Sequence, residues 1–143
     1  MSKLLSALAL IAALYLGWGQ LQGNHAVAEG PATADALIAR AVSEHASGIR
    51  VNGEGVVTRV FSDDKFGSRH QRFILRLASG QTVLVAHNID LAPRVAGLKA
   101  GDTVAFSGIY EWNARGGVVH WTHRDPRGAH AAGWLKHNGE TYQ

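Results

Sequence analysis

Histidine and arginine side chains gather in two stretches of this 143-residue chain, residues 69–90 and residues 120–125. A neutral imidazole can bind a transition metal or accept a proton, and an arginine offers fixed positive charge to an anion. Each stretch ends in an aspartate, which can complete a metal site or orient a ring. The candidate ligand-binding residues are Arg69, His70, Arg72, His87, Asn88, Asp90, His120, Trp121, His123 and Asp125.

Two chemistries are open to the candidate metal ligands and catalytic residues, His70, His87 and His123. Imidazoles from separate strands can hold a divalent metal cofactor. Alternatively, a neutral histidine can act as general base while Arg69 or Arg72 stabilises the negative charge of an attacked phosphodiester. No HExxH, CxxC or nucleophile-elbow pattern accompanies them. A purely structural role is the third possibility, in which these side chains bond to one another and to backbone groups.

The residues that must position these side chains form a predicted β-hairpin at 69–90. Phe73, Leu75 and Leu77 alternate with residues of a second face, which are Arg72, Ile74 and Arg76, and a β-branched run follows from Thr82. A two-residue loop at Ser79 and Gly80 is expected to join the strands. The predicted cross-strand partners are then Arg72 with His87 and His70 with Ile89. Polar groups therefore collect at the end of the hairpin far from its turn.

Three more strands are predicted by the same alternation, at residues 49–61, 102–112 and 118–123. Gly53 and Gly55 interrupt the first of them, which indicates a bend or a bulge. Residues 31–47 have helical periodicity, with Thr33 as the cap and Gly48 after the end. Five strands in this order predict an all-β fold, a small five-stranded OB-fold-like barrel with one N-terminal helix.

This barrel topology brings the histidines together. In an OB fold the third strand runs parallel to the fifth, so His87 is expected near the end of residues 118–123. His70 reaches the same rim through the hairpin. Because side chains alternate along a strand, His120 and His123 should face opposite sides unless a bulge intervenes. Trp121 adds an aromatic surface on which bases or sugar rings can stack.

The first 28 residues predict export. Lys3 precedes the apolar run Leu4–Leu16, and Ala26-Val27-Ala28 is a small-residue cleavage site before Glu29. An uncleaved single-span anchor is the alternative, and a buried helix is a third possibility. We expect a periplasmic protein or one anchored in the inner membrane and facing the periplasm, touching the membrane only through this segment. Residues 29–48 then form a helix and linker, and residues 49–143 form the barrel domain.

Composition sets wider limits. With 46% hydrophobic and 17% charged residues, the chain has the make-up of one ordinary globular domain. The absence of cysteine excludes a disulfide framework and a thiolate metal site. The net charge of +3 permits a phosphate-bearing partner without requiring one.

Several stretches also resemble a known family, over residues 53–143. They are GSRHQRFILRLASGQT, AHNIDLAPR, YEWN, GGVVHWTHRDP and GWLKHNGETYQ. Together they are similar to an exported bacterial family known as a domain of unknown function. The resemblance implies export and an OB-like domain, and it implies no catalytic residues.

The leading functional interpretation is an exported OB-fold module that binds an anionic ligand at a rim of histidines and arginines. The ligand is a nucleic acid or another phosphate-bearing molecule, including a small anionic one. The alternative is a metal-assisted phosphodiester hydrolase, such as a small nuclease, that uses the same histidine cluster. A structural envelope protein without a ligand is the third interpretation.

Overall fold

The computed structural model describes residues 33–143, and the predicted export segment lies outside them. The helix α2 spans Ala34–Glu44, inside the predicted range. Thr33 caps it, because the Thr33 side chain accepts a hydrogen bond from the backbone N–H of Ala36. Ile38 and Ala41 bury its apolar face. Over the described residues, no helix has the length and apolar character needed to cross a membrane.

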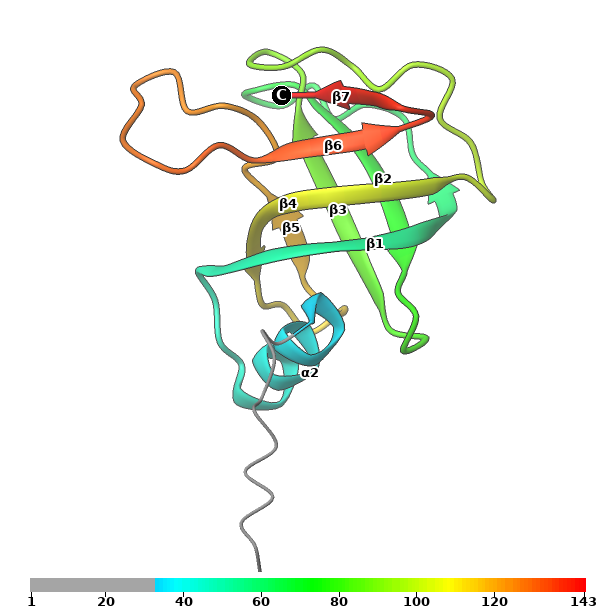
Figure 1. Ribbon diagram of the computed structural model, residues 1–143, viewed down its shortest axis with the longest axis vertical. Helices are drawn as coiled ribbons and strands as arrows, with labels where there is room; N and C mark the ends of the chain where they lie inside the picture. The colour runs from blue at the N-terminus through cyan, green and yellow to red at the C-terminus, as the bar shows by residue number, and fades with distance from the viewer. Residues whose placement is uncertain (1–32) are drawn as a thin grey trace, which may run out of the picture. The chain divides into compact units, whose positions relative to one another are not determined.

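Seven strands follow the helix and belong to one hydrogen-bonded sheet (Figure 1). Five of them close a barrel, as predicted, with β1 paired to both β2 and β4 and with β3 parallel to β5. The order around the barrel is β1-β2-β3-β5-β4, which is the order of an OB fold. The strands are β1 (Ile49–Val60), β2 (His70–Arg76), β3 (Thr82–Asn88), β4 (Thr103–Glu111), β5 (Val118–His120), β6 (Trp134–His137) and β7 (Glu140–Tyr142).

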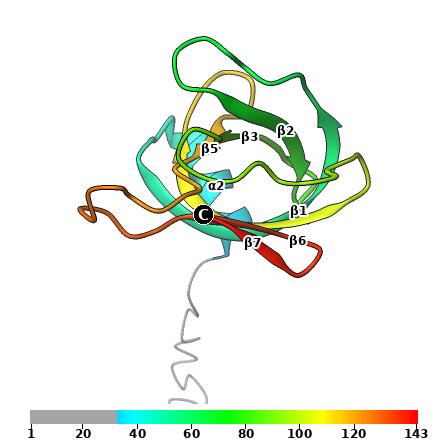
Figure 2. The same ribbon diagram turned by 90° about the horizontal axis from the view of Figure 1, so that it is seen from above.

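The inward side chains of these strands make the core. Seen from above in Figure 2, the strands form a ring, and Figure 1 shows α2 across its lower end. The predicted core residues are all buried: Phe73, Leu75, Val83, Val85, Val104 and Phe106.

The glycines of β1 allow close packing, while the irregularity in that strand lies further on. A Cβ on Gly53 would come within 2.5 Å of the Ala34 Cβ on the helix, so this glycine lets α2 approach the barrel. A Cβ on Gly55 would lie 2.9 Å from the carbonyl oxygen of Arg76. The register shift lies between Val57 and Arg59, within the part of β1 that pairs with β2.

The hairpin of β2 and β3 has a different register from the predicted one. Leu77 N–H donates to the carbonyl of Gln81, so the loop holds three residues, Ala78 to Gly80. Gly80 has a φ of 87°, which is the left-handed residue that a three-residue hairpin loop requires. The predicted partners were therefore wrong by one residue. The observed pairs are His70 with Asn88, Gln71 with His87 and Arg72 with Ala86.

The C-terminal tail, expected to lie against the barrel, does so as a second hairpin. β6 pairs with β4 at Ala105 to Ser107, beyond the part of β4 that pairs with β5. His137 on β6 is buried and makes a 2.8 Å bond through Nε2 to a carboxyl oxygen of Asp102. The backbone N–H of Lys99 and then His137 lower the pKa of Asp102. This contact fastens the hairpin to the start of β4.

Asp35 connects the helix to the barrel, and its loss should cost about 1 to 2 kcal/mol of unfolding free energy. The Asp35 carboxylate accepts a 2.8 Å hydrogen bond from the Ser79 backbone N–H at the hairpin tip. It also stands in the first turn of α2, where negative charge is favoured. We expect Asp35→Ala to lower the urea midpoint of unfolding and Asp35→Asn, which keeps an acceptor, to lower it less. An unchanged midpoint for the alanine variant would contradict this role.

Candidate ligand-binding face

Five of the ten predicted site residues line one cleft, which we call the rim cleft. Its volume is about 230 Å³. It lies past the short pairing of β3 with β5, which ends at Val85 and Val119. The remaining walls come from Ser68, Ala86 and Leu91. The predicted residues in it are His70, Asn88, His120, Trp121 and His123.

His120 and His123 share this cleft because the chain stops alternating between them. Trp121 has a φ of 55°, in the left-handed region that a bulky residue rarely adopts. The strand ends at His120, and the turn at Trp121 directs His123 to the same cleft. The interruption allowed for in the prediction is therefore present, as a single left-handed residue.

Carbonyl groups fix which tautomer two of these rings adopt when they are neutral. Nδ1 of His70 lies 2.8 Å from the carbonyl of Ser68, and Nδ1 of His123 lies 2.6 Å from that of Arg124. A carbonyl only accepts, so Nδ1 carries a hydrogen, and in the neutral ring Nε2 then keeps a lone pair. His120 has a different kind of partner: its Nε2 lies 3.4 Å from a carboxylate oxygen of Glu111. The cleft thus presents imidazole acceptors to a ligand.

His87 lies in the core and does not line the rim cleft. It is fully buried, with Nδ1 2.8 Å from the Thr122 hydroxyl and Nε2 2.9 Å from the carbonyl of Pro93. The Nε2 hydrogen must point to that carbonyl, so Nδ1 accepts from Thr122. Burial lowers the pKa of His87, the bond to Pro93 opposes this, and the nearby His123 and His70 lower it further.

The predicted acidic residues hold loops in place. Asp90 accepts from the backbone N–H of Arg69 and pairs with its guanidinium at 2.7 Å, contacts that lower the pKa of Asp90. Asp125 accepts three backbone N–H bonds, from Arg127, Ala129 and His130, and these lower its pKa. Across residues 33–143, no three His, Asp or Glu side chains are grouped so that they could hold a metal ion.

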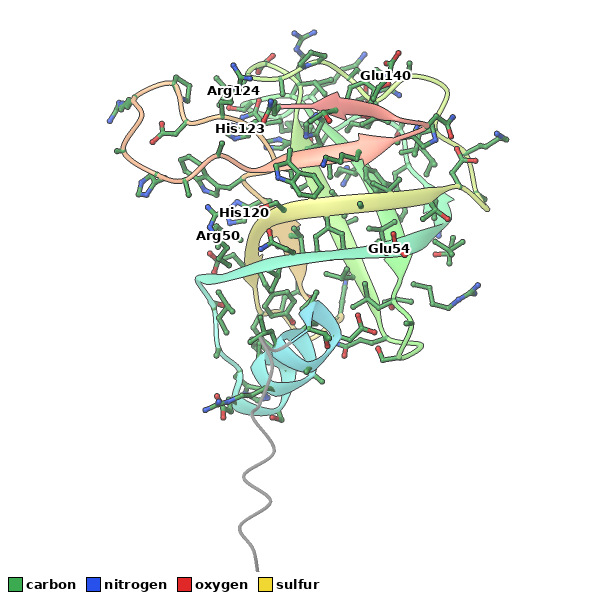
Figure 3. The ribbon with its side chains drawn as sticks, in the orientation of Figure 1. Arg50, Glu54, His120, His123, Arg124 and Glu140 are labelled. Atoms are coloured by element: carbon green, nitrogen blue, oxygen red, sulfur yellow. The ribbon has the colours of Figure 1, made fainter. Side chains whose placement is uncertain are left out.

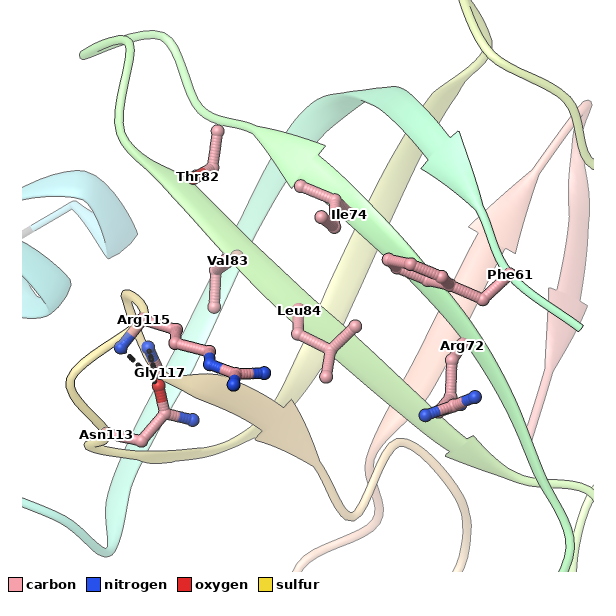
Figure 4. A pocket seen from close by; sticks show the side chains of 9 residues that line it. All are labelled: Phe61, Arg72, Ile74, Thr82, Val83, Leu84, Asn113, Arg115 and Gly117. Carbon is pink, nitrogen blue, oxygen red and sulfur yellow. Dashed lines mark hydrogen bonds between the residues drawn. The ribbon is translucent and has the colours of Figure 1, made fainter. Parts of the chain in front are cut away.

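Arg72 lies in a second cleft, the outer groove, with a volume of about 310 Å³ (Figure 4). Its base is formed by outward side chains of β2 and β3, including Ile74 and Leu84. Asn113 and Arg115 line it from the β4–β5 loop. The other residues are Phe61, Thr82, Val83 and Gly117, and none of the nine is acidic.

Phe61 holds two arginines at the edge of the outer groove. The guanidinium carbons of Arg59 and Arg72 lie 4.6 Å and 5.7 Å from the centre of its ring. Arg72 also donates to the carbonyl of Ser62 at 3.3 Å. Its Nε is buried without a hydrogen-bond partner in the described part of the chain. The internal bonds of the protein therefore leave Arg72 incompletely satisfied.

The rim cleft and the outer groove lie on one face of the barrel. His70, Arg72 and Ile74 alternate outward along β2, and Asn88, Ala86 and Leu84 are their partners on β3. The loops before β2 and before β5 flank this face. In OB folds, the face of strands 2 and 3 and these two loops bind oligonucleotides and oligosaccharides. We call this surface the outer face.

Comparison with known proteins gives one match, to a family described as "Protein of unknown function (DUF3465)", over residues 23–143. The chain belongs to the DUF3465 family. No curated protein and no solved structure matches it. The resemblance to a domain of unknown function is thereby confirmed, and the fold of this DUF3465 domain is a small closed barrel.

Sequence reasoning missed Phe61 and Arg115, which complete the outer groove. Phe61 directly follows β1, and Arg115 lies inside the turn between β4 and β5, which the sequence marks only as a turn. The predicted barrel topology could have identified them, because it already placed these two loops beside the hairpin. The sequence predicted one site at the rim, whereas the structure of this DUF3465 domain has two clefts along the outer face.

Proposed function

We propose that this DUF3465 domain is an exported OB-fold module that binds a phosphate-bearing chain, with single-stranded nucleic acid as its ligand class. The observation that carries the proposal is the outer groove, which is lined by Phe61, Arg72 and Arg115 and by no acidic side chain. Export is supported by the residues of the N-terminal segment, from Lys3 onward.

The outer face supplies the contacts that such a ligand needs. Arginines bind phosphate oxygens through their planar set of N–H donors. Exposed aromatic rings stack on bases without regard to sequence, a role suited to Phe61 and to Trp121. The lone pairs of neutral His70 and His123 accept hydrogen bonds from base N–H groups. A single-stranded oligonucleotide lying along β2 and β3 would contact these arginines, aromatic rings and histidines in succession.

The hydrolase alternative has less support. Both ring nitrogens of His87 are bonded inside the protein, so His87 is not available as base or ligand in this arrangement. The residues that the structure describes offer no three-ligand group for a metal. A binding module therefore accounts for the site better than a metal-assisted nuclease.

Removing two arginines from the outer groove should weaken binding of a fluorescent 12-residue oligothymidine roughly tenfold or more, which corresponds to about 1.4 kcal/mol. The double variant is Arg72→Met with Arg115→Met, and fluorescence anisotropy measures binding. Each lost phosphate contact should also reduce the slope of log affinity against log salt by about 1. Arg40→Met is the matched control, because Arg40 is exposed on α2 and pairs with Glu44.

Four outcomes of these experiments decide the proposal. The proposal is supported if wild type and the Arg40 control bind the oligonucleotide with similar affinity and the double variant binds it weakly. Equal binding by the folded double variant, or no binding by wild type at low salt, refutes it. The oligonucleotide should also remain intact with magnesium or zinc present, since cleavage lost on His70→Ala would support the hydrolase instead.

A further inference from the structure

We propose a second binding site beside the outer face, a pocket that takes a single ring carrying a carboxylate or phosphate. Its walls are Arg50, Ile109, Trp121 and His130, and its volume is about 230 Å³. We call it the Arg50 pocket. Trp121 is shared with the rim cleft, and the other three residues are not. The site therefore does not depend on the proposed binding of nucleic acid at the outer groove.

The position of Trp121 is the first support. Its left-handed backbone is unfavourable for an aromatic residue, and such outliers concentrate at binding sites. Neighbours hold it there, since Gly133 has no Cβ to displace the Trp121 carbonyl and Thr122 is buried against His87. Trp121 is 38% exposed at the surface. A strained turn thus presents a large aromatic ring to solvent.

Three histidines contact this ring from different directions, and the furthest, His120, is edge-on with centroids 6.4 Å apart. His123 stacks on Trp121 with centroids 5.3 Å apart and planes 28° apart. His130 approaches edge-on, with centroids 5.5 Å apart and planes 68° apart. The indole is therefore a fixed surface, of the kind on which a base or the apolar face of a sugar stacks.

Arg50 provides positive charge that no carboxylate in the described part of the chain pairs with. Its guanidinium donates to the carbonyl of Ala131 at 2.9 Å and to the hydroxyl of Ser107 at 3.4 Å, and both acceptors are neutral. Among residues 33–143, no carboxylate lies within ion-pair distance of it. A guanidinium has five N–H donors, so donors remain for an anion. The two bonds hold the group in one orientation before a ligand arrives.

The remaining walls are fixed and of suitable character. Ile109 gives an apolar surface on β4. His130 stands in a loop that Asp125 holds through its bonds to three backbone N–H groups. In Figure 3, Arg50, His120 and His123 lie on the same side of the barrel, near this loop. Aromatic, apolar and cationic walls in one small pocket match a ring with one anionic group.

A sugar acid and a mononucleotide share this chemistry, so both serve as probes. We would titrate the full chain with glucuronic acid and with thymidine monophosphate, and use glucose and thymidine as neutral counterparts. Ligand-observed NMR measures binding at millimolar concentration. At least one anionic probe should bind, and its neutral counterpart should bind at least tenfold more weakly. The probe that binds shows whether the ligand is a sugar acid or a mononucleotide.

Variants locate the site. Arg50→Gln should weaken the anionic probe at least tenfold, and Trp121→Ala should remove the preference for a ring over acetate. Arg40→Gln is the control for loss of charge. The double variant of Arg72 and Arg115 should bind the anionic probe with wild-type affinity. Thermal unfolding checks that each variant is folded. The proposal is overturned if neither anionic probe binds, if neutral probes bind equally, or if the folded Arg50 variant binds like wild type.

Discussion

Replacing His87 with alanine should destabilise the domain by about 3 to 5 kcal/mol, a large part of the 5 to 15 kcal/mol that holds a typical domain folded. The side chain is fully buried, so its removal leaves a cavity. It also leaves the Thr122 hydroxyl and the Pro93 carbonyl without their partner. Urea denaturation measures the loss. His120→Ala, which removes a partly exposed histidine of the same region, is the control and should cost far less.

The same residue should make stability depend on pH. Burial, more than any neighbour, lowers the pKa of folded His87 below its ordinary 6.5. The unfolded chain then binds a proton first as pH falls, so stability is full above 6.5 and is lost between that value and the folded-state pKa. Unfolding free energy should fall from pH 7.5 to pH 5, and less steeply in His87→Gln. Parallel profiles for the two proteins would contradict this.

Adding one methyl group at Gly133 should cost about 3 kcal/mol or more. A Cβ there would overlap the carbonyl oxygen of Trp121 and lie 2.7 Å from that of Ser107. Both are backbone atoms, which cannot rotate away as a side chain can. Gly133→Ala must therefore move Trp121, the β5–β6 loop, or both.

Two measurements test the change at Gly133. The urea midpoint should fall sharply, while Ala132→Ser, at the exposed neighbouring residue, should leave it nearly unchanged. The indole N–H resonance of Trp121 should also shift, because the ring loses its fixed position between His123 and His130. A variant with wild-type stability and an unshifted resonance would show that the contact is easily relieved.

The fold was predictable because the strands carry the signal themselves. Phe73, Leu75 and Val104 are buried residues at every second position of their strands, and inward burial of one face leaves few arrangements for five such strands. The parallel pairing of β3 with β5 followed from that topology and is confirmed. The separate strands β6 and β7 were missed, because four and three residues are too short for alternation to be distinctive.

The site was less predictable, because single residues decide to which face of the barrel its side chains point. Counting Ala78 as part of a strand shifts the hairpin by one position, and a one-residue shift exchanges the two faces. That shift separates Arg72, which faces outward, from His87, which faces the core. The turn at Trp121 is a second case, since no pattern in the sequence distinguishes a left-handed tryptophan from an extended one.

The pairing of β1 with β4 has a consequence for the order of events in folding. The two strands of the central hairpin are neighbours in the chain and can form early, whereas Ile49 must find Tyr110, roughly 60 positions later. The barrel stays open on one side until β5, which pairs with both β3 and β4, has been synthesised, and β6 then has to add to β4. On a ribosome the apolar face of the hairpin therefore stays uncovered after Asn88 until β5, which ends at His120, has been made. We expect closure to be the slow step, on the order of milliseconds to seconds.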